Sequence, residues 1–226
     1  MNFSERNKKV AIARWKRINE LEKTNIKNDR DTLRLKSTLC GFLAGDGSVK
    51  KRGDNGFFHY EIKFFPDDGL MLARYLYALH KVYAKTPSIR VEDNVFNVRL
   101  TSRVVYEDLT KYSCFGIHDW SVPNDLFKIK GAKEAWLRAF FSAEAYVGPN
   151  HIKLQTVNKK GMLVVSQLLN ELGIDHRTYY YVPRKKEHSP VSILMITKKQ
   201  ARNLFLKRIG FWHKKKTNAL REALDL

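Results

Sequence analysis

The sequence of 226 residues predicts an α+β fold made of two similar halves that are related by a pseudo-two-fold axis. Three observations predict it. Segments with apolar residues at helical spacing alternate with segments of alternating polar and apolar residues, which is typical of helices and antiparallel strands. The same order of segments occurs twice along the chain. Each copy starts with a long helix that ends in small residues and one acid, so these two helices are candidates for a shared interface.

Residues 1–31 predict a basic helix and a linker. Apolar side chains recur at helical spacing within residues 4–22, at Ala11, Trp15, Ile18 and Leu21. Residues 23–31 have no such period and are rich in Asn, Asp and Lys, which is typical of a linker. The pattern leaves open whether the helix packs on the body through Trp15 or lies along phosphate groups of a partner.

Residues 32–130 form the predicted first half. A helix is expected from Thr32 to about Gly45, and a second helix follows from the spacing of the apolar residues over 70–79. Alternating patterns predict strands over 56–65, 88–91 and 95–101, and a closing helix is expected over 102–112.

Residues 131–210 repeat this order. A helix is expected from Gly131 to about Ala143, followed by a strand over 151–157, a helix over 161–172, strands over 176–182 and 191–197, and a helix over 198–207. Residues 211–226 form a basic tail, which we expect either to pack back on the body or to follow a phosphate backbone.

The two long helices end in related sequences, residues 39–47 and 137–145. When the two are aligned, small residues fall four positions apart, and therefore on one helix face, at Gly41 and Gly45 and at Ala139 and Ala143. Small side chains allow two helix backbones to approach closely. We therefore expect these helices to pack against each other through the two small faces.

The net charge indicates the class of partner. The chain holds 42 Lys and Arg against 23 Asp and Glu, a formal charge of +19. Such an excess is typical of proteins that bind polyanions. Because the basic residues are spread along the chain rather than gathered on one amphipathic helix, nucleic acid is favoured over a membrane surface.

The same composition indicates a compartment. The sequence contains neither an apolar run of membrane-spanning length nor an apolar leader, so we expect an intracellular protein of the cytoplasm, nucleoid or organelle matrix that is not secreted. Cys40 and Cys114 lie in apolar runs without metal-binding spacing, and both are predicted to be buried free thiols.

The two acids at the helix ends, Asp46 and Glu144, predict a metal site. A carboxylate at a helix C-terminus faces the negative end of the helix dipole, and two neighbouring carboxylates repel each other. A divalent cation such as Mg²⁺ offsets both effects and can also bind phosphate oxygens. Acids that hold such cations support hydrolysis of phosphodiesters, so the chemistry suggested is that of a nuclease.

These residues resemble the motifs of the two-motif LAGLIDADG homing endonucleases, and the resemblance extends over about residues 32–207. In that family the eighth motif position is the metal-binding acid, which falls on Asp46 and Glu144. The preceding backbone carbonyls, of Gly45 and Ala143, often complete the coordination of Mg²⁺ or Mn²⁺. Two positions depart from the family pattern. The sixth position, which is often Asp, is Ala44 in the first copy and Ser142 in the second, and the final Gly of the second copy is replaced by Ala145.

The resemblance also implies one more strand after each motif helix and a saddle of antiparallel strands that faces double-stranded DNA. The alternation of the strands agrees, since polar residues share one face and such side chains read base edges in the major groove. In the first half the expected DNA-binding residues are Lys50, Lys51, Arg52, His59, Glu61, Lys63, Arg90, Asn97 and Arg99. In the second half they are His151, Lys153, Gln155, Arg177, Tyr179, Tyr181, Arg184 and Lys185.

Three further residues receive catalytic roles from the resemblance. Arg103 and Lys199 follow the last strand of each half and resemble basic residues that stabilise developing phosphate charge. Lys198 is the alternative to Lys199, since the register is open by one residue. Gln155 resembles a polar residue that positions water, and its counterpart in the first half stays open.

The expected function is therefore that of a monomeric, site-specific endonuclease that hydrolyses one phosphodiester on each strand of a long, non-palindromic DNA target with a divalent metal. An RNA-splicing maturase that binds intron RNA, or a DNA-binding protein that does not cleave, are alternatives on the same scaffold. A basic ribosome-associated protein is a third class. The acid pair favours cleavage, because a protein that only binds has little use for two mutually repelling carboxylates.

Overall fold

The computed structural model describes all residues except 1–2, 55–56 and 184–188. An N-terminal helix α1 (Phe3–Thr24) precedes the first half. That half comprises α2 (Arg30–Ala44), β1 (Gly47–Asp54), β2 (Phe57–Phe64), α3 (Gly69–Tyr83), β3 (Ser88–Glu92), β4 (Val95–Thr101) and α4 (Arg103–Thr110). A short 3-10 helix, η1 (Leu126–Lys128), leads to the second half.

The second half repeats the order of the first. It comprises α5 (Ala132–Glu144), β5 (Tyr146–Gly148), β6 (His151–Thr156), α6 (Lys159–Glu171), β7 (Arg177–Tyr181), β8 (Val191–Ile196) and α7 (Lys199–Arg208), and the chain continues into α8 (Lys214–Glu222). The two sheets have equivalent strand orders, β1-β2-β4-β3 and β5-β6-β8-β7, and the strand pairs are antiparallel. The predicted α+β fold with two duplicated halves is confirmed.

Strands β1 and β5 are the strands that the resemblance implied after each motif helix. Neither has a clear local pattern, because β1 is largely charged and β5 contains only three residues. Each pairs with the following strand, β1 with β2 and β5 with β6. They connect the ends of α2 and α5 directly to the sheets, so each motif acid lies at a junction between helix and sheet.

Helices α2 and α5 pack through the small residues that the sequence aligned. A Cβ placed on Gly41 would lie 2.4 Å from the carbonyl oxygen of Trp136, and one on Gly45 would lie 2.5 Å from the Cβ of Ala143. At the other end of the interface, the Ser37 hydroxyl donates a hydrogen bond of 2.7 Å to the carbonyl oxygen of Ala132. The helices therefore approach closely enough to exclude side chains at two positions.

One continuous apolar core runs through both halves. Tyr75, Trp136 and Phe140, which the helical patterns predicted as core residues, are at most 1% exposed. Trp136 and Phe140 stack with their ring centroids 4.7 Å apart. The core thus fixes the crossing of α2 and α5, from which both sheets extend.

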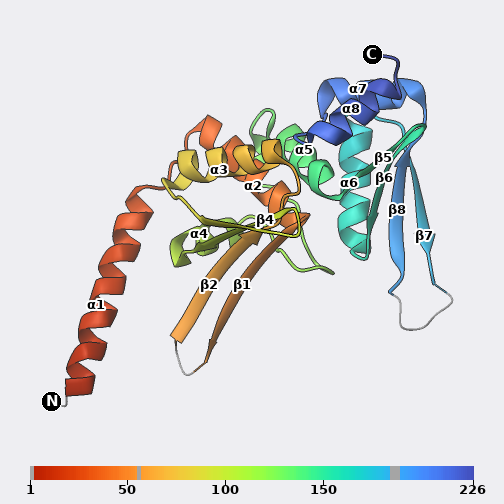
Figure 1. The fold of residues 1–226 in the computed structure, drawn as a ribbon. Coiled ribbons are helices and arrows are strands. Elements are labelled where there is room, and N and C mark those ends of the chain that lie inside the picture. The colour runs from red at the N-terminus through yellow and green to blue at the C-terminus, as the bar shows by residue number, and fades with distance from the viewer. Residues whose placement is uncertain (1–2, 55–56, 184–188) are drawn as a thin grey trace.

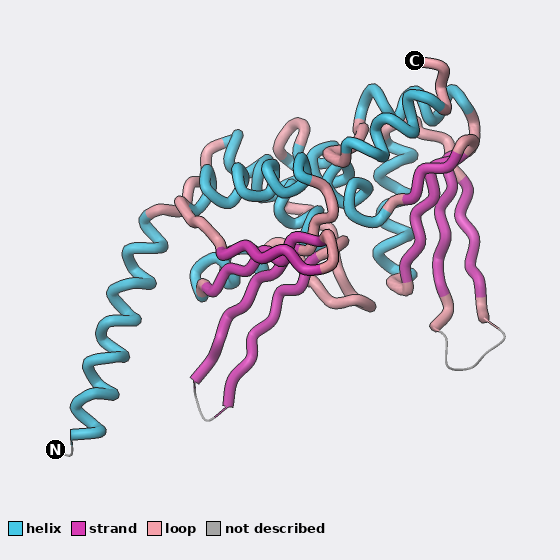
Figure 2. The backbone as a smooth tube through the Cα atoms, in the orientation of Figure 1, coloured by secondary structure: helices cyan, strands magenta, loops and turns pink. Residues whose placement is uncertain are grey.

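The two sheets project from the same side of a helical layer. Figure 1 shows the free ends of the β1–β2 and β7–β8 pairs pointing in the same direction, and the tube in Figure 2 shows α2, α3, α5, α7 and α8 at the opposite side. Helix α8 lies against the second half, with Leu220 and Leu224 buried, so the C-terminal tail packs back on the body.

The expectations for the N-terminal helix and for the two cysteines have different outcomes. Helix α1 extends away from the body beside the first half (Figure 1), and Trp15 is 63% exposed, so the helix does not pack through that residue. Cys40 is a buried free thiol as predicted, but the prediction for Cys114 was wrong, because it is exposed. Cys114 lies in the loop after α4, where its backbone N–H donates a hydrogen bond to the Ser121 hydroxyl, and it is therefore not part of the apolar face of that helix.

Candidate metal and DNA site

Asp46 and Glu144 lie side by side at the crossing of the motif helices. Asp46 follows the C-cap residue of α2, and Glu144 is the last residue of α5. A Cβ placed on Gly45 would lie 3.3 Å from the Cγ of Glu144, which shows how closely the two helix ends approach. Both acids are half-buried. The structure thus brings together the two acids that the sequence singled out.

Burial changes the acidity of both groups. The pKa of Glu144 is raised from its ordinary value of 4.5 to about 7, first by burial and then by the neighbouring carboxylate of Asp46, while Lys216 opposes the shift. The pKa of Asp46 is also raised, mainly by burial, and Lys216 again opposes. The folded chain without metal therefore favours a proton at this site, as expected for paired buried acids.

These shifts predict a pH dependence of stability. Between about pH 4.5 and pH 7 the unfolded chain releases the Glu144 proton while the folded chain keeps it, so the stability of the metal-free protein should fall as the pH rises through this range. A divalent cation that binds the ionised acids should restore stability over the same range. Thermal unfolding from pH 4.5 to 8, with and without Ca²⁺, checks this. The difference in thermal midpoint between metal-free wild type and Glu144→Gln should grow with pH. Profiles of midpoint against pH that run parallel for the two proteins would contradict a raised pKa of Glu144.

The donor set fits a hard divalent cation. Within the described part of the chain, no group of three or more His, Cys, Asp and Glu side chains is placed to hold a metal. A cation at the acid pair would therefore complete its shell with backbone carbonyl, water or phosphate oxygens, which Mg²⁺ accepts readily. The carbonyls of Gly45 and Ala143 adjoin the acids in sequence and are candidates for that role.

Lys216, which sequence reasoning missed, lies beside this pair. Its Nζ donates hydrogen bonds of 2.6 Å to the carbonyl oxygen of Ser142 and 2.8 Å to that of Ala143. Burial lowers the pKa of Lys216, and the nearby acids, Asp46 first among them, oppose that change. A signal existed, because the apolar Leu220 four residues later places Lys216 on the inward face of α8.

Gln155 lies close enough to Glu144 to share a cavity with it. Glu144, Gly45 and Gln155 line one cavity of about 250 Å³. The strand registers identify the residue of the first half that corresponds to Gln155. Ser48 and Tyr146 each lie two residues after a motif acid, and they pair with Lys63 and Lys153. Gln155, two residues after Lys153, therefore corresponds to Phe65, which has no polar side-chain group. The two halves therefore differ at this position.

The structure does not bring Arg103 or Lys199 to the acids. In the first sheet Gly47 is level with Val98, and β4 runs from there away from Asp46 before it reaches Arg103. Arg103 bonds Glu107 at 2.7 Å instead. In the second sheet β8 likewise runs away from Glu144, and Lys199 bonds Asp225 at 2.6 Å. The alternative, Lys198, bonds Asp175 at 2.6 Å.

The register of the first sheet gathers most of its predicted DNA-binding residues on one face. Cross-strand partners share a face of a sheet, which joins Lys50, Arg52, His59, Glu61, Lys63, Arg90, Asn97 and Arg99. Glu61 is only 7% exposed, and its carboxylate bonds Arg99 at 2.8 Å and Lys63 at 3.1 Å. It therefore positions two cations rather than standing free. Lys51 lies on the opposite face, 4.0 Å above the ring of Phe58, because neighbouring residues of a strand point to opposite sides.

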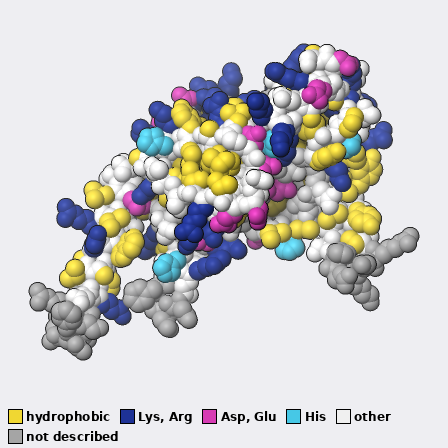
Figure 3. Space-filling view, in the orientation of Figure 1, with side chains coloured by type: hydrophobic (Ala, Val, Ile, Leu, Met, Phe, Trp, Pro, Cys, Tyr) yellow, Lys and Arg dark blue, Asp and Glu magenta, His cyan; other side chains and the backbone are white. Residues whose placement is uncertain are grey.

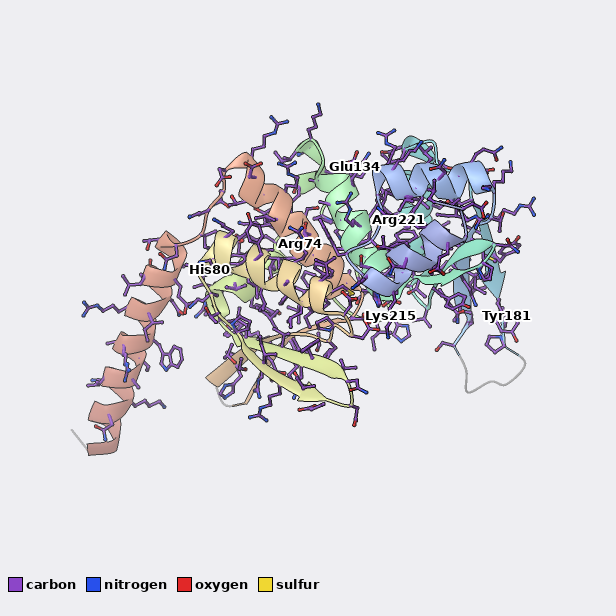
Figure 4. All side chains as sticks on the ribbon, turned by 45° about the horizontal axis from the view of Figure 1, so that its top comes forward. Arg74, His80, Glu134, Tyr181, Lys215 and Arg221 are labelled. Atoms are coloured by element: carbon purple, nitrogen blue, oxygen red, sulfur yellow. The ribbon has the colours of Figure 1, made fainter. Side chains whose placement is uncertain are left out.

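The second sheet presents a more apolar face. Its register joins His151, Lys153, Gln155, Arg177, Tyr179 and Tyr181 with three residues that sequence reasoning did not assign, Val191, Ile193 and Met195. Figure 4 shows Tyr181 at the end of β7, and Arg184 and Lys185 lie outside the described residues. Lys and Arg side chains are spread over the molecular face in Figure 3. No helix in the described part of the chain has the length and apolarity needed to cross a membrane.

Comparison with known proteins finds relatives of this chain. Residues 132–210 match the family model described as LAGLIDADG-like domain. A DNA polymerase of Thermococcus kodakarensis is 26% identical over 209 residues, and one of Thermococcus aggregans is 25% identical over 242 residues. The alignments cover 84% and 96% of this chain but 12% of each polymerase. An uncharacterized protein of Methanocaldococcus jannaschii is 24% identical, with 98% of this chain and 84% of that protein aligned.

Solved structures with the same architecture include two homing endonucleases. A structure of mesophilic variants of I-DmoI aligns with a TM-score of 0.61 and 18% identity, over 79% of this chain and 96% of that one. I-WcaI bound to its DNA recognition sequence aligns with a TM-score of 0.59 and 15% identity, over 92% of this chain and 91% of that one. Other I-DmoI structures contain DNA with Mn, Ca or Mg. The chain therefore has the LAGLIDADG homing endonuclease fold in its form with two duplicated halves.

Proposed function

We propose that this chain is a site-specific, metal-dependent endonuclease that cuts both strands of a long DNA target. One observation carries the proposal, namely the half-buried pair of Asp46 and Glu144 at the ends of two helices packed backbone against backbone. A fold that only needed stability would not place two acids together where burial raises the pKa of both. The DNA-bound homing endonucleases of the same fold support this function.

The side chains at the helix crossing have separable roles in this proposal. Asp46 and Glu144 hold a divalent cation, Mg²⁺ or Mn²⁺, with the carbonyls of Gly45 and Ala143 as further ligands. The cation, when bound, activates water and neutralises charge that develops on the phosphate. Gln155, which lines the same cavity as Glu144, orients a water molecule next to the scissile phosphate. The first half has Phe65 at the corresponding position, so a side chain that orients water is present only in the second half.

The two sheets form the DNA interface. We assign residues 32–130 and 131–210 to one half-site each, with residues 1–31 and 211–226 outside the repeat. Because the first sheet presents Arg and Lys while the second presents Val191, Ile193 and Met195 among its polar residues, the two half-sites have different sequences. Arg reads guanine edges, and apolar side chains contact thymine methyl groups. The target is therefore non-palindromic, and one chain suffices as a monomer.

A matched pair of neighbouring lysines tests the interface. Lys50→Ala should weaken binding to duplex DNA and lower the slope of log affinity against log salt by about one, because one phosphate contact is lost. Lys153→Ala and Arg177→Ala should behave in the same way. Lys51→Ala removes the same charge from the opposite face of the sheet and should leave the slope unchanged. Salt titrations of binding measure the effect, and equal slopes for the Lys50 and Lys51 variants would contradict this face.

The function itself is tested with a library of randomised duplex DNA. The purified chain is incubated with the library and Mg²⁺, with EDTA in a parallel sample, and new ends are sequenced. We expect discrete breaks on both strands at one recurring, asymmetric sequence that are absent with EDTA. Binding without breaks would contradict the endonuclease. Gel shifts with structured RNA would then test the maturase, which the sequence left as the alternative.

A further inference from the structure

The C-terminal tail reaches the candidate metal site from outside the duplicated halves. The backbone N–H of Trp212 donates a hydrogen bond of 2.7 Å to the Ser142 hydroxyl, and that of Lys214 donates one of 3.0 Å to Asp68 in the first half. Leu220 is fully buried. These contacts fix α8 against both halves. The position of Lys216 is therefore set by the packing of α8, and Lys216 is not a freely moving surface side chain.

Lys216 bonds the carbonyls at the end of α5 in the way a cation would. Its two acceptors, the carbonyl oxygens of Ser142 and Ala143, are among the last carbonyls of the helix, which lack partners within the helix. The Ala143 carbonyl is also a candidate metal ligand. Lys216 opposes the rise in the pKa of both Asp46 and Glu144, while the hydrogen bonds of its Nζ go to the two carbonyl oxygens. Its charge is therefore close enough to act on the acid pair.

We propose that the Lys216 ammonium takes the place of a cation in the metal-free protein and thereby sets how tightly the acid pair binds a divalent metal. Lys216 is a positioning residue in this account. It offsets the repulsion between Asp46 and Glu144 and bonds the Ala143 carbonyl, so a metal must compete for that carbonyl oxygen and tolerate a nearby positive charge. This inference rests on the proposed metal site.

The test compares two adjacent lysines of α8 in the DNA-free protein, with Ca²⁺ as the probe. Lys216→Met should bind Ca²⁺ about tenfold more tightly than wild type, at the lower end of the changes in metal affinity caused by groups next to ligands. Its thermal midpoint without metal should fall, and Ca²⁺ should raise that midpoint by more than in wild type. Lys215→Met removes the same charge from the exposed neighbour, at the start of α8 in Figure 4, and should match wild type.

A second substitution separates charge from helix capping. Lys216→Gln keeps a hydrogen-bond donor for the two carbonyls but removes the charge, and it should also bind Ca²⁺ more tightly. If both Lys216 variants bind Ca²⁺ as the Lys215 variant does, then Lys216 only caps α5 and the inference is wrong, even where the thermal midpoint falls. A Ca²⁺ response that is absent from every variant, or that survives in Asp46→Asn/Glu144→Gln, would instead contradict the metal site and with it the proposed function.

Discussion

Replacing either motif acid should abolish double-strand cleavage and leave DNA binding intact. We expect Asp46→Asn and Glu144→Gln each to reduce the cleavage rate by about 10³-fold, the scale of losing a main electrostatic contribution to a transition state. Each substitution preserves shape and removes one charge. Because less negative charge then faces the phosphates, affinity for DNA should be unchanged or slightly higher. Single-turnover cleavage and equilibrium binding on the selected target measure the two quantities separately.

A control in the same helix makes this prediction specific. Glu134→Gln removes a carboxylate from the first turn of α5, at the opposite end from Glu144 (Figure 4), and should cleave as wild type does. If either motif variant retained more than about a tenth of the wild-type rate, the acids would not be the metal ligands. If binding were lost together with cleavage, the acids would have a structural role instead.

The second large effect concerns the packing of the motif helices. Gly41→Ala should lower the thermal midpoint by about 10 °C, or about 3 kcal/mol, because the added Cβ would lie 2.4 Å from the Trp136 carbonyl oxygen, which is backbone and cannot move aside alone. The helix ends would also separate, so metal affinity should fall with stability. Calorimetry and Ca²⁺ titration check both.

Gly69→Ala provides the matched control. Gly69 is also helical, at the first position of α3, but a Cβ there meets nothing within 4 Å. Its thermal midpoint should equal or slightly exceed that of wild type, since Ala favours a helix over Gly. Similar midpoints for the Gly41 and Gly69 variants would show that α2 and α5 do not pack as closely as described.

The part of the site that depends on local sequence was predictable. Small residues four apart on two helices, each followed by an acid, predicted both the close helix crossing and the pairing of Asp46 with Glu144, because helix geometry fixes which residues share a face. Strand alternation similarly predicted most of one polar sheet face. It failed where three basic residues follow one another, since Lys51 must point away from Lys50 and Arg52.

The part that depends on contacts distant in sequence was not predictable. Lys216 meets α5 more than seventy residues away along the chain, and the run of three lysines in which it lies does not by itself distinguish an inward side chain from a solvated one. Arg103 and Lys199 received catalytic roles from their order after the last strands. The sheet register places them beyond the far ends of strands that run away from the acids, and local sequence does not fix that register.

The position of the breaks relative to the bound protein tests the central claim most directly. Asp46 and Glu144 lie between the two sheets, so a duplex bound by both sheets must cross the acid pair at the middle of its contact region. Footprinting and strand-resolved mapping of the breaks on the selected target measure both positions in one sample. We predict one break on each strand near the centre of the protected region. The sequences preferred on the two sides of the breaks should differ from each other. Breaks at an edge of the footprint, or on one strand only, would contradict the account.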